Sequence, residues 1–412
     1  MIDLKKNFLV YGYGISGQSI SKYLKRKKSY YRIFDDFSDI SLLKESINLN
    51  SLKKNIKNFD YFVVSPSIKI VRNHILYPFR EKILIDLDFL SLEIKNQIVF
   101  GITGTEGKST ICSYLSQYLS HTYKTLIIGN YGNTILDNDN LKNILVKTKI
   151  IIVELSSYQL DKLKFLKINH AIITNIYSDH LDYHGSIKNY IKSKFKIQSF
   201  LNKDGILHIN SLAKKRYSHL INIQNKNINT IPNYKFKNNI FGYDIDLLNK
   251  NYTKKILSFS KLNYDKNLKL KNLPFRNEII ENKSKPIIIN DSKSTNLENS
   301  ISKINQISLK NKVIILGGNL KKSTITKISV KNSFVLIFGP NRLEIIKKLV
   351  FINSRFYTFV DLENLFKFLN IVIYHSNLDI ILFSPGGESF DQFKNYAHRG
   401  MVFNNYIKKF LN

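Results

Sequence analysis

The residues of this chain best suited to chemistry form the run ThrGlyThrGluGlyLysSerThr at positions 103–110. The run follows the apolar segment IVFGI and precedes a helical pattern. A phosphate-binding loop needs glycines that expose backbone N–H groups, a lysine for the β- and γ-phosphates, and a neighbouring hydroxyl for Mg²⁺. Gly107, Lys108 and Ser109 meet these needs, although the strict G-x-x-x-x-G-K-[ST] spacing fails because Ile102 stands where glycine is required. We predict nucleotide phosphate binding, because a chance GKS at a strand-to-helix junction is rarer than a chance GKS in a lysine-rich chain.

A second motif, Gly12-x-Gly14-x-x-Gly17, lies between the strand-like segment NFLVYG and another helical pattern. Asp35 and Asp36 follow the next expected strand. This is the dinucleotide-fold fingerprint in its usual context, where glycines allow close backbone approach and the helix N-terminus receives a phosphate. By motif alone an NAD-dependent dehydrogenase fits, and so does a tight glycine turn without a ligand.

Single charged residues outside these motifs are weaker indicators of a functional site. Glu154 follows the apolar run IIIV, which favours a carboxylate at a strand end, a suitable hard ligand for Mg²⁺, over a surface acid. Lys194 is one lysine among several in KNYIKSKFK, and on sequence alone it belongs to a solvated surface. Asp291 and Lys293 follow the strand-like run IIIN.

Strand-rich blocks interspersed with helical patterns predict an α/β fold with mainly parallel sheets. Three blocks are visible, and we expect domains at residues 1–94, 95–280 and 281–412. A lysine- and asparagine-rich stretch near 212–275 leaves the far boundary of the second block open. Each block ends its strands in loops, where open α/β sheets place their ligands.

The composition is that of a globular protein. At 412 residues, with 43% hydrophobic and 12% aromatic content, the chain is long enough for two or three cores, and we prefer three. No apolar run approaches the roughly 20 residues that span a bilayer. The start MIDLKKNFLVYGYG leaves no room for a signal peptide, so we expect a cytoplasmic protein. The single cysteine, Cys112, cannot form an internal disulfide and is expected to be a buried small hydrophobe.

The formal net charge of +32 could indicate nucleic-acid binding. Lysines are nevertheless spread along the whole chain together with many Asn and Ile residues, which favours compositional drift over a basic binding surface. We therefore expect no nucleic-acid partner. A general positive field could still help to capture small polyanionic substrates.

Four segments together resemble the Mur ligase family. They are GITGTEGKST, in which the family usually has Asn at Glu106, and three others: ELSSYQL at 154–160, NDSKSTN at 290–296 and SPGGESFDQFKNY at 384–396. Their order and spacing match the family across nearly the whole chain, most weakly at about 210–270. The DSKSTN segment points to the branch of the family that adds D-glutamate, because sister ligases carry other segments there.

The resemblance implies a Rossmann-like N-terminal domain that binds a UDP-linked substrate, a central P-loop-type ATPase domain, and a Rossmann-like C-terminal domain that binds the amino acid. It implies three small-molecule substrates, UDP-N-acetylmuramoyl-L-alanine, D-glutamate and ATP, with two Mg²⁺ sites and a monomeric protein. The implied reaction is phosphorylation of the acceptor carboxylate by ATP, then attack of the amine on the acyl phosphate. This is chemically reasonable, since phosphorylation supplies a good leaving group and cations offset the developing charge.

The resemblance also assigns site residues. Catalytic roles fall to Lys108, His180, Lys194 and Lys293. The implied metal ligands are Ser109, Glu154, His180 and Lys194, the last as a carbamate. ATP binding falls to Gly104, Thr105, Gly107, Lys108, Ser109, Thr110, Asn251, Arg276 and Asp291. Binding of the UDP-linked substrate falls to Gly14, Ile15, Ser16, Asp35 and Asn130, and binding of D-glutamate to Thr295, Lys321, Ser389 and Tyr396. Lys322 competes with Lys321, because the run LGGNLKKS allows either register.

Two departures from the family pattern bear on activity. Glu106 puts a carboxylate beside the phosphate loop, and Ser67 replaces a usual glycine near the expected UDP site. They leave open a folded but degenerate relative, or a ligase for another amino acid. A dehydrogenase would use only the first block, and a nucleic-acid-stimulated ATPase would leave the segment DQFKNY without a role. The ligase hypothesis gives all three blocks a function.

Overall fold

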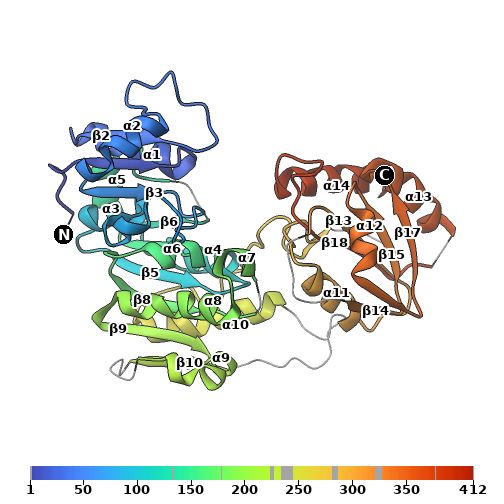
Figure 1. The fold of residues 1–412 in the computed structure, drawn as a ribbon. Coiled ribbons are helices and arrows are strands. Elements are labelled where there is room, and N and C mark those ends of the chain that lie inside the picture. The colour runs from blue at the N-terminus through green and yellow to red at the C-terminus, as the bar shows by residue number, and fades with distance from the viewer. Residues whose placement is uncertain are drawn as a thin grey trace. The chain divides into compact units, whose positions relative to one another are not determined.

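The structure, a computed structural model, describes residues 2–131, 134–177, 179–222, 227–232, 245–280, 286–320, 327–375 and 377–411. The chain forms two compact units. Unit 1 comprises Met1–Asn233 and Asn249–Leu270, and unit 2 comprises Tyr234–Leu248 and Lys271–Asn412. Figure 1 shows the elements of both. The domain boundaries expected at 94 and 280 stay predictions.

Unit 1 begins with a four-stranded parallel sheet in the order β2-β1-β3-β4. Its strands are β1 (Phe8–Tyr11), β2 (Tyr31–Phe34), β3 (Tyr61–Val64) and β4 (Ile83–Leu84). Its helices are α1 (Ile15–Arg26), α2 (Leu49–Asn55) and α3 (Asp86–Glu93), with the short 3₁₀ turns η1 (Ile56–Asn58) and η2 (Tyr77–Lys82). The strands read as continuous apolar runs because helices cover both faces of a parallel sheet.

A second, six-stranded parallel sheet follows in the order β10-β9-β8-β5-β7-β6. Its strands are β5 (Ile98–Thr103), β6 (Thr125–Gly129), β7 (Ile150–Glu154), β8 (Ile168–Ile173), β9 (Leu201–Asn210) and β10 (Ile228–Ile231). Its helices and turns are α4 (Lys108–Ser120), α5 (Leu141–Lys147), α6 (Ser157–Lys162), α7 (Leu181–His184), α8 (Ile187–Phe195), η3 (Lys196–Phe200), α9 (Ser211–Arg216), η4 (Ser218–Leu220) and α10 (Ile245–Ser260).

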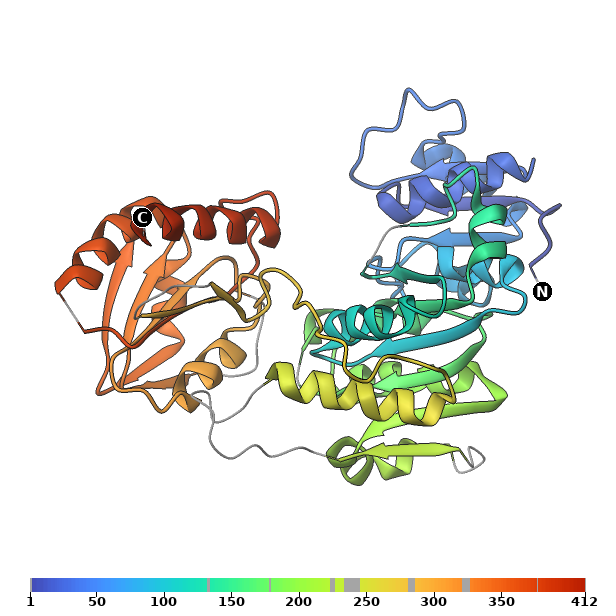
Figure 2. The same ribbon diagram turned by 180° about the vertical axis from the view of Figure 1, so that it is seen from behind.

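Helices cover both faces of this second sheet. Helices α6 and α8 lie on the face turned to the viewer in Figure 1, and α4 and α10 on the face seen in Figure 2. Local sequence sets the helix starts, since Ser156 and Gln159 form a capping box on α6 and Ser186 caps α8. One continuous core of buried apolar residues, from Phe8 in β1 to Ile209 in β9, joins the two sheets of unit 1.

Unit 2 contains a six-stranded sheet in the order β11-β12-β18-β13-β15-β17, parallel except for β11, and a parallel pair β14-β16. The strands are β11 (Glu278–Ile280), β12 (Ile287–Asn290), β13 (Lys312–Gly317), β14 (Ile328–Lys331), β15 (Phe334–Phe338), β16 (Leu349–Ile352), β17 (Arg355–Phe359) and β18 (Ile380–Gly386). The helices are α11 (Leu297–Gln306), α12 (Arg342–Lys347), α13 (Leu362–His375) and α14 (Tyr396–Leu411). Separate apolar clusters pack on the two faces of the sheet, so it is doubly covered.

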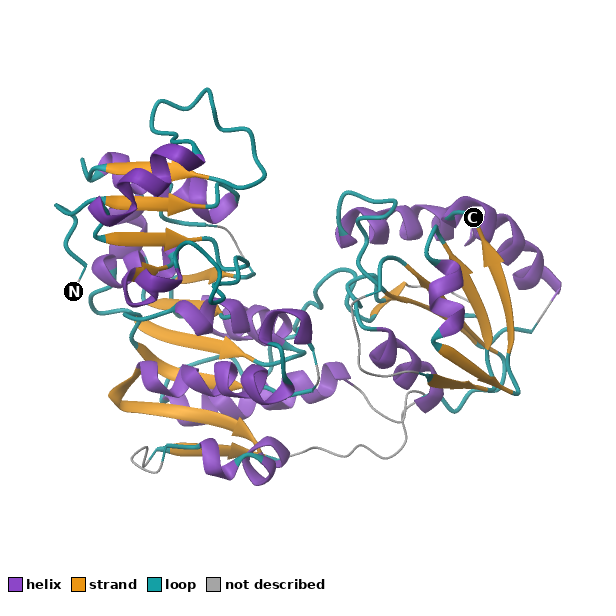
Figure 3. Ribbon diagram, in the orientation of Figure 1, coloured by secondary structure: helices purple, strands orange, loops and turns teal. Residues whose placement is uncertain are grey.

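The predicted α/β class with mainly parallel sheets is confirmed, as the alternation of strands and helices in Figure 3 shows. Every strand expected from an apolar run, from NFLVYG to DIILFSPGG, is present. Cys112 is buried in α4, as expected. Across the described ranges, no helix combines the length and apolar character needed to cross a bilayer.

Candidate active site

The phosphate loop joins β5 to α4 at the carboxyl edge of the second sheet. Gly107 caps α4 with φ of 78°, in the left-handed region that favours glycine. A Cβ atom on Gly104 would lie 1.9 Å from Thr174 Oγ1, so the loop packs directly against the end of β8. Both glycines are needed for a backbone that brings N–H groups to the start of a helix, which is a favourable place for a phosphate.

The segment after β8 holds this loop through main-chain contacts. Asn175 O accepts from Thr105 N at 3.0 Å, and Asn175 Oδ1 accepts from Glu106 N at 2.9 Å. Thr174 Oγ1 donates to Glu106 O at 2.7 Å. Because these contacts use backbone atoms of Glu106, the unusual glutamate leaves the path of the loop intact.

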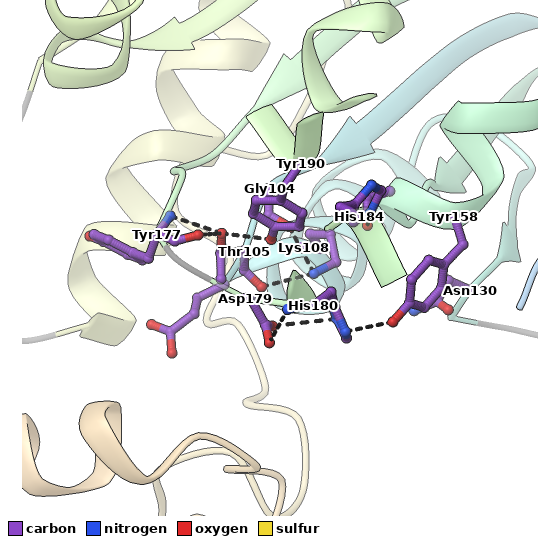
Figure 4. A network of polar contacts seen from close by, with 12 residues as sticks. Gly104, Thr105, Lys108, Asn130, Tyr158, Tyr177, Asp179, His180, His184 and Tyr190 are labelled. Atoms are coloured by element: carbon purple, nitrogen blue, oxygen red, sulfur yellow. Dashed lines mark hydrogen bonds and ion pairs between the residues drawn. The ribbon is translucent and has the colours of Figure 1, made fainter. Parts of the chain in front are cut away.

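Two lysines converge on the carbonyl of Gly104, as Figure 4 shows for Lys108. Lys108 Nζ donates to Gly104 O at 3.0 Å and to Thr105 O at 2.9 Å. Lys194 Nζ, from α8, donates to the same Gly104 O at 2.7 Å. The ammonium groups therefore sit at the mouth of the loop, and a bound phosphate would replace carbonyl contacts with charge-assisted ones.

Lys194 is 2% exposed, so the solvated-surface interpretation of its sequence context is wrong. Its ammonium also lies 4.5 Å from the centroid of the Tyr190 ring. Burial, reinforced by the charge of Lys108, lowers the pKa of Lys194 well below its usual value. The structure thus gives a special environment to a lysine that composition alone does not distinguish.

Glu154 connects two residues that the sequence assigned to different ligands. Ser109 Oγ donates to Glu154 Oε2 at 2.5 Å, and Asn130 Nδ2 donates to Glu154 Oε1 at 2.8 Å. Glu154 is the last residue of β7 and follows the apolar residues IIIV of that strand. It is buried, so it is not a surface acid.

A second polar group surrounds His180, which adopts the left-handed conformation with φ of 53°. Tyr158 OH lies 2.6 Å from His180 Nδ1, and Asp179 Oδ2 lies 3.4 Å from His180 Nε2, as the dashed lines of Figure 4 mark. Thr105 Oγ1 and Tyr190 OH lie 3.0 Å apart and link the loop to α8. Tyr158 stands within the segment ELSSYQL and Asp179 directly precedes His180, but nothing in their residue types marked them as partners of the histidine.

The donor set around Ser109 fits a hard divalent cation. Mg²⁺ takes few protein ligands, usually a carboxylate and a hydroxyl beside phosphate oxygens and waters. Ser109 and Glu154 supply that pair in direct contact. In the described part of the chain, no three His, Cys, Asp or Glu side chains gather as a metal cage would require. A cation here would therefore depend on oxygens from the phosphate itself.

Of the residues assigned to the UDP-linked substrate, all except Asn130 lie at the carboxyl edge of the first sheet. Gly14 precedes α1 without a side-chain cap, and Ile15 and Ser16 open the helix. Asp35 Oδ2 accepts from Tyr13 N at 2.6 Å, and Asp35 Oδ1 accepts from two further backbone N–H groups. Burial acts to raise the pKa of Asp35, but these hydrogen bonds outweigh it and hold the pKa below its usual value. Ser67 is exposed.

Unit 2 brings Asp291 together with a lysine that the sequence did not single out. Lys303 Nζ lies 2.6 Å from Asp291 Oδ2, and Ser384 Oγ donates to the same oxygen at 2.9 Å. Lys293 Nζ lies 4.0 Å from the centroid of the Tyr396 ring at the start of α14. Two residues assigned to different tasks, Lys293 and Tyr396, are thus neighbours.

Arg399, also missed from the sequence, ties the two predicted loops of unit 2 together. It is completely buried, and its guanidinium donates to Ser292 Oγ, Ser292 O and Gly387 O at 3.2, 2.7 and 3.0 Å. Ser389 is buried in the second of these loops and Thr295 is half-buried in the first. Lys321 and its competitor Lys322 lie outside the described residues.

The adenine residues expected from the sequence stay predictions. Asn251 lies in α10 of unit 1, and Arg276 precedes β11 in unit 2. Asn249, two residues before Asn251, is the asparagine that packs on the phosphate loop, since a Cβ on Gly107 would lie 2.9 Å from Asn249 Oδ1. Tyr252 OH fixes the helix by donating to Ile173 O at 2.8 Å.

Known proteins that are similar to this chain belong to the Mur ligases. A family model described as the Mur ligase middle domain matches residues 102–273. Curated relatives named UDP-N-acetylmuramoylalanine–D-glutamate ligase include that of Francisella philomiragia, 27% identical over 98% of this chain and 98% of the relative. Others are those of Pseudothermotoga lettingae, 28% identical over 97% and 98%, and Prochlorococcus marinus, 29% identical over 99% and 97%.

Solved structures share the fold. A MurF ligase from Thermotoga maritima, solved in complex with ADP, has a TM-score of 0.56 at 15% identity, covering 100% of this chain and 99% of that one. A pseudomurein peptide ligase type C from Methanothermus fervidus has a TM-score of 0.53 at 16% identity, covering 98% and 99%.

Proposed function

We propose that this chain, a member of the Mur ligase family, is the ATP-dependent ligase that adds D-glutamate to UDP-N-acetylmuramoyl-L-alanine in peptidoglycan precursor synthesis. The relatives that match it over nearly their whole length carry that activity in their names. The structural observation that carries the proposal is the hydrogen bond from Ser109, the residue after Lys108 in the phosphate loop, to Glu154.

The first step joins a phosphoryl group to a carboxylate. An oxygen of the alanyl carboxylate attacks the γ-phosphorus of ATP, the bond to the bridging oxygen breaks, and ADP leaves. Charge spreads over the transferring phosphoryl oxygens, so cations placed around them lower the barrier. Lys108 is suited to this task, because nucleotide binding would move its Nζ from the carbonyls of Gly104 and Thr105 to the phosphate.

The second step forms the amide. The amine of D-glutamate attacks the acyl carbon, the C–O bond to phosphate breaks, and the amine proton is released with inorganic phosphate as the other product. D-Glutamate brings two carboxylates, which need cationic and hydroxyl donors. Thr295, Ser389 and Tyr396 in unit 2 are the described candidates, and we keep Lys321 as the cation expected from the family resemblance. Lys293 keeps its proposed catalytic role.

Mg²⁺ would be held by Ser109 and Glu154, where it would neutralise phosphate charge during transfer. For the second cation site, His180 is a candidate together with Lys194. Lys194 as an ammonium would repel Mg²⁺, so its role there requires conversion to a carbamate by CO₂, which supplies oxygen donors. Asn130, which donates to Glu154, is the proposed contact for the muramoyl substrate. The cytoplasmic location and monomeric state stay predictions.

Phosphate release from ATP tests the proposal. The ligase needs both co-substrates, so release should require UDP-N-acetylmuramoyl-L-alanine and D-glutamate together. Equal release without the UDP-linked substrate would contradict it. Stimulation by RNA or DNA would favour the nucleic-acid ATPase, and nicotinamide turnover would favour the dehydrogenase suggested by the first glycine motif.

A further inference from the structure

Unit 1 contains a pocket of about 430 Å³ that none of the residues assigned above lines. Four segments form its wall: the loop after β3, helices α6 and α7, and the end of α8 with η3. The lining residues that matter here are Lys69, Asp161, Tyr183, Asn189, Lys192 and Lys196. Pockets of this size accept small-molecule ligands.

Helix α8 presents opposite faces to the two sites. Asn189 and Lys192, at positions i and i+3, fall on one side of α8 and line the pocket together with Lys196 at the start of η3. Lys194, two residues from either lysine, points to the other side and donates to Gly104 O. The pocket is therefore a separate site that shares one helix with the phosphate loop.

The lining is strongly cationic. Lys69 Nζ donates to Asp182 O at 2.9 Å, and Lys196 Nζ donates to Asp161 O at 2.8 Å. A backbone carbonyl uses one of the three N–H donors of an ammonium group, so each lysine is held in place with donors to spare. Among the described lining residues, Asp161 contributes the one carboxylate, against three lysines.

A buried lysine behind the wall adds to this field. Lys162 Nζ donates to Pro66 O at 2.8 Å and to Tyr183 OH. It lies 5.0 Å from the centroid of the Tyr183 ring, which Lys69 approaches to 6.0 Å. Burial, together with the charge of Lys196, lowers the pKa of Lys162 to about 8, although Asp161 opposes the shift. Crowded cations of this kind would be stabilised by an anion.

We propose that this pocket binds a phosphate group, either as inorganic phosphate or as part of a phosphorylated small molecule. Three ammonium groups in one lining suit a compact dianion with several acceptor oxygens better than a single carboxylate. A polar wall with one carboxylate suits neither an apolar ligand nor a divalent cation. The proposal does not depend on the ligase activity.

Binding of inorganic phosphate to the full chain tests the proposal. The phosphate loop also binds phosphate, so calorimetry should be done in a Lys108→Ala background that weakens that site. We expect binding of one phosphate per chain to persist there and to weaken roughly tenfold or more when Lys69→Gln and Lys192→Gln are added, because the phosphate loses charge-assisted hydrogen bonds from two lysines. Asp161→Asn should tighten binding severalfold, since it removes the opposing carboxylate.

Lys188→Gln is the matched control, because Lys188 is exposed on the same helix and does not line the pocket. It should leave phosphate affinity unchanged, and thermal melting should verify that every variant folds. Glycerol 3-phosphate should compete, and tighter binding than inorganic phosphate would identify a phosphate ester as the ligand. Loss of all phosphate binding in Lys108→Ala alone, or unchanged affinity after removal of Lys69 and Lys192, would overturn the proposal.

Discussion

Asp291 and Lys303 form an ion pair in unit 2, with Nζ 2.6 Å from Oδ2. The side chains are 5% and 19% exposed, and Ser384 Oγ shares the same carboxylate oxygen. Water therefore screens the pair only weakly, and removing one partner leaves the other as an unpaired, largely buried charge. Lys303, in helix α11, thus holds in place the carboxylate of Asp291, which the family resemblance assigns to ATP binding.

Lys303→Met should lower the free energy of unfolding by about 1 to 3 kcal/mol, less than a fully buried pair because Lys303 is partly exposed. Urea denaturation measures the loss. Lys310→Met, at an exposed lysine, is the control and should have no effect. The loss should be smaller in an Asp291→Asn background, because the unpaired charge is then gone. If the losses of unfolding free energy in the two single variants simply add in the double variant, the two side chains do not stabilise each other.

Ser109→Ala should raise the Mg²⁺ concentration needed for half-maximal turnover roughly tenfold, because one oxygen donor beside Glu154 is lost. Titration of activity with Mg²⁺ at saturating ATP measures the change. Ser113→Ala, one turn later on α4, is the matched control, since Ser113 contacts Gln117 instead. An unchanged Mg²⁺ requirement in Ser109→Ala would remove Ser109 from the cation site.

Lys194→Ala should reduce turnover by at least about a thousandfold if the carbamate fills a ligand position, since a missing charged group at a transferring phosphoryl group costs several kcal/mol. Acetate should restore part of the activity by occupying the vacated place. Lys188→Ala, at an exposed lysine of the same helix, should be unaffected. Full activity of Lys194→Ala would refute the assignment.

Acid should destabilise unit 1 through a pair of buried histidines. Asn229 Nδ2 lies 2.9 Å from His208 Nδ1, and His208 Nε2 lies 3.1 Å from His170 Nδ1. The Asn229 amide nitrogen donates, so the proton of neutral His208 sits on Nε2 and is donated to Nδ1 of neutral His170. Burial lowers the pKa of His170 to about 4 and that of His208 well below its usual value.

The unfolded chain, with histidine pKa values near 6.5, binds more protons than the folded chain between about pH 6.5 and 4. Stability is therefore complete above about pH 6.5 and falls as the pH drops, by up to about 1.4 kcal/mol per pH unit for each histidine. His170→Gln keeps an acceptor for His208 and should reduce the slope of unfolding free energy against pH. His219→Gln, at an exposed histidine, should not. Equal slopes in all three proteins would contradict this account.

Local sequence was sufficient to predict the positions of the strands and of the phosphate loop. The apolar runs in β5, β7 and β12 are long enough to be read directly, and a glycine, lysine and hydroxyl in sequence define the loop. Glu154 was placed correctly for the same reason, because it ends such a run.

The remaining contacts depend on distant segments. Lys303 reaches Asp291 from a helix, Tyr158 reaches His180 from α6, and Asn249 rather than Asn251 packs on Gly107. Lys194 looked like surface because its neighbours along the chain are lysines, whereas the helix turns it inward. Such pairings follow from how helices pack on the sheets, which no local pattern records.

The proposed reaction couples D-glutamate to the UDP-linked muramoyl-alanine. The most direct measurement is mass spectrometry of the UDP-linked product after incubation with ATP, Mg²⁺ and one amino acid at a time, comparing D-glutamate with L-glutamate, L-lysine and L-alanine. We expect an amide product with D-glutamate and at least about a hundredfold less with the others. L-Lysine and L-alanine lack the second carboxylate and leave its donors unpaired, and L-glutamate has the opposite configuration at Cα, so its amine and two carboxylates cannot all take the positions of those of D-glutamate. Preferential product with another amino acid, or none with D-glutamate while ATP is still hydrolysed, would contradict it.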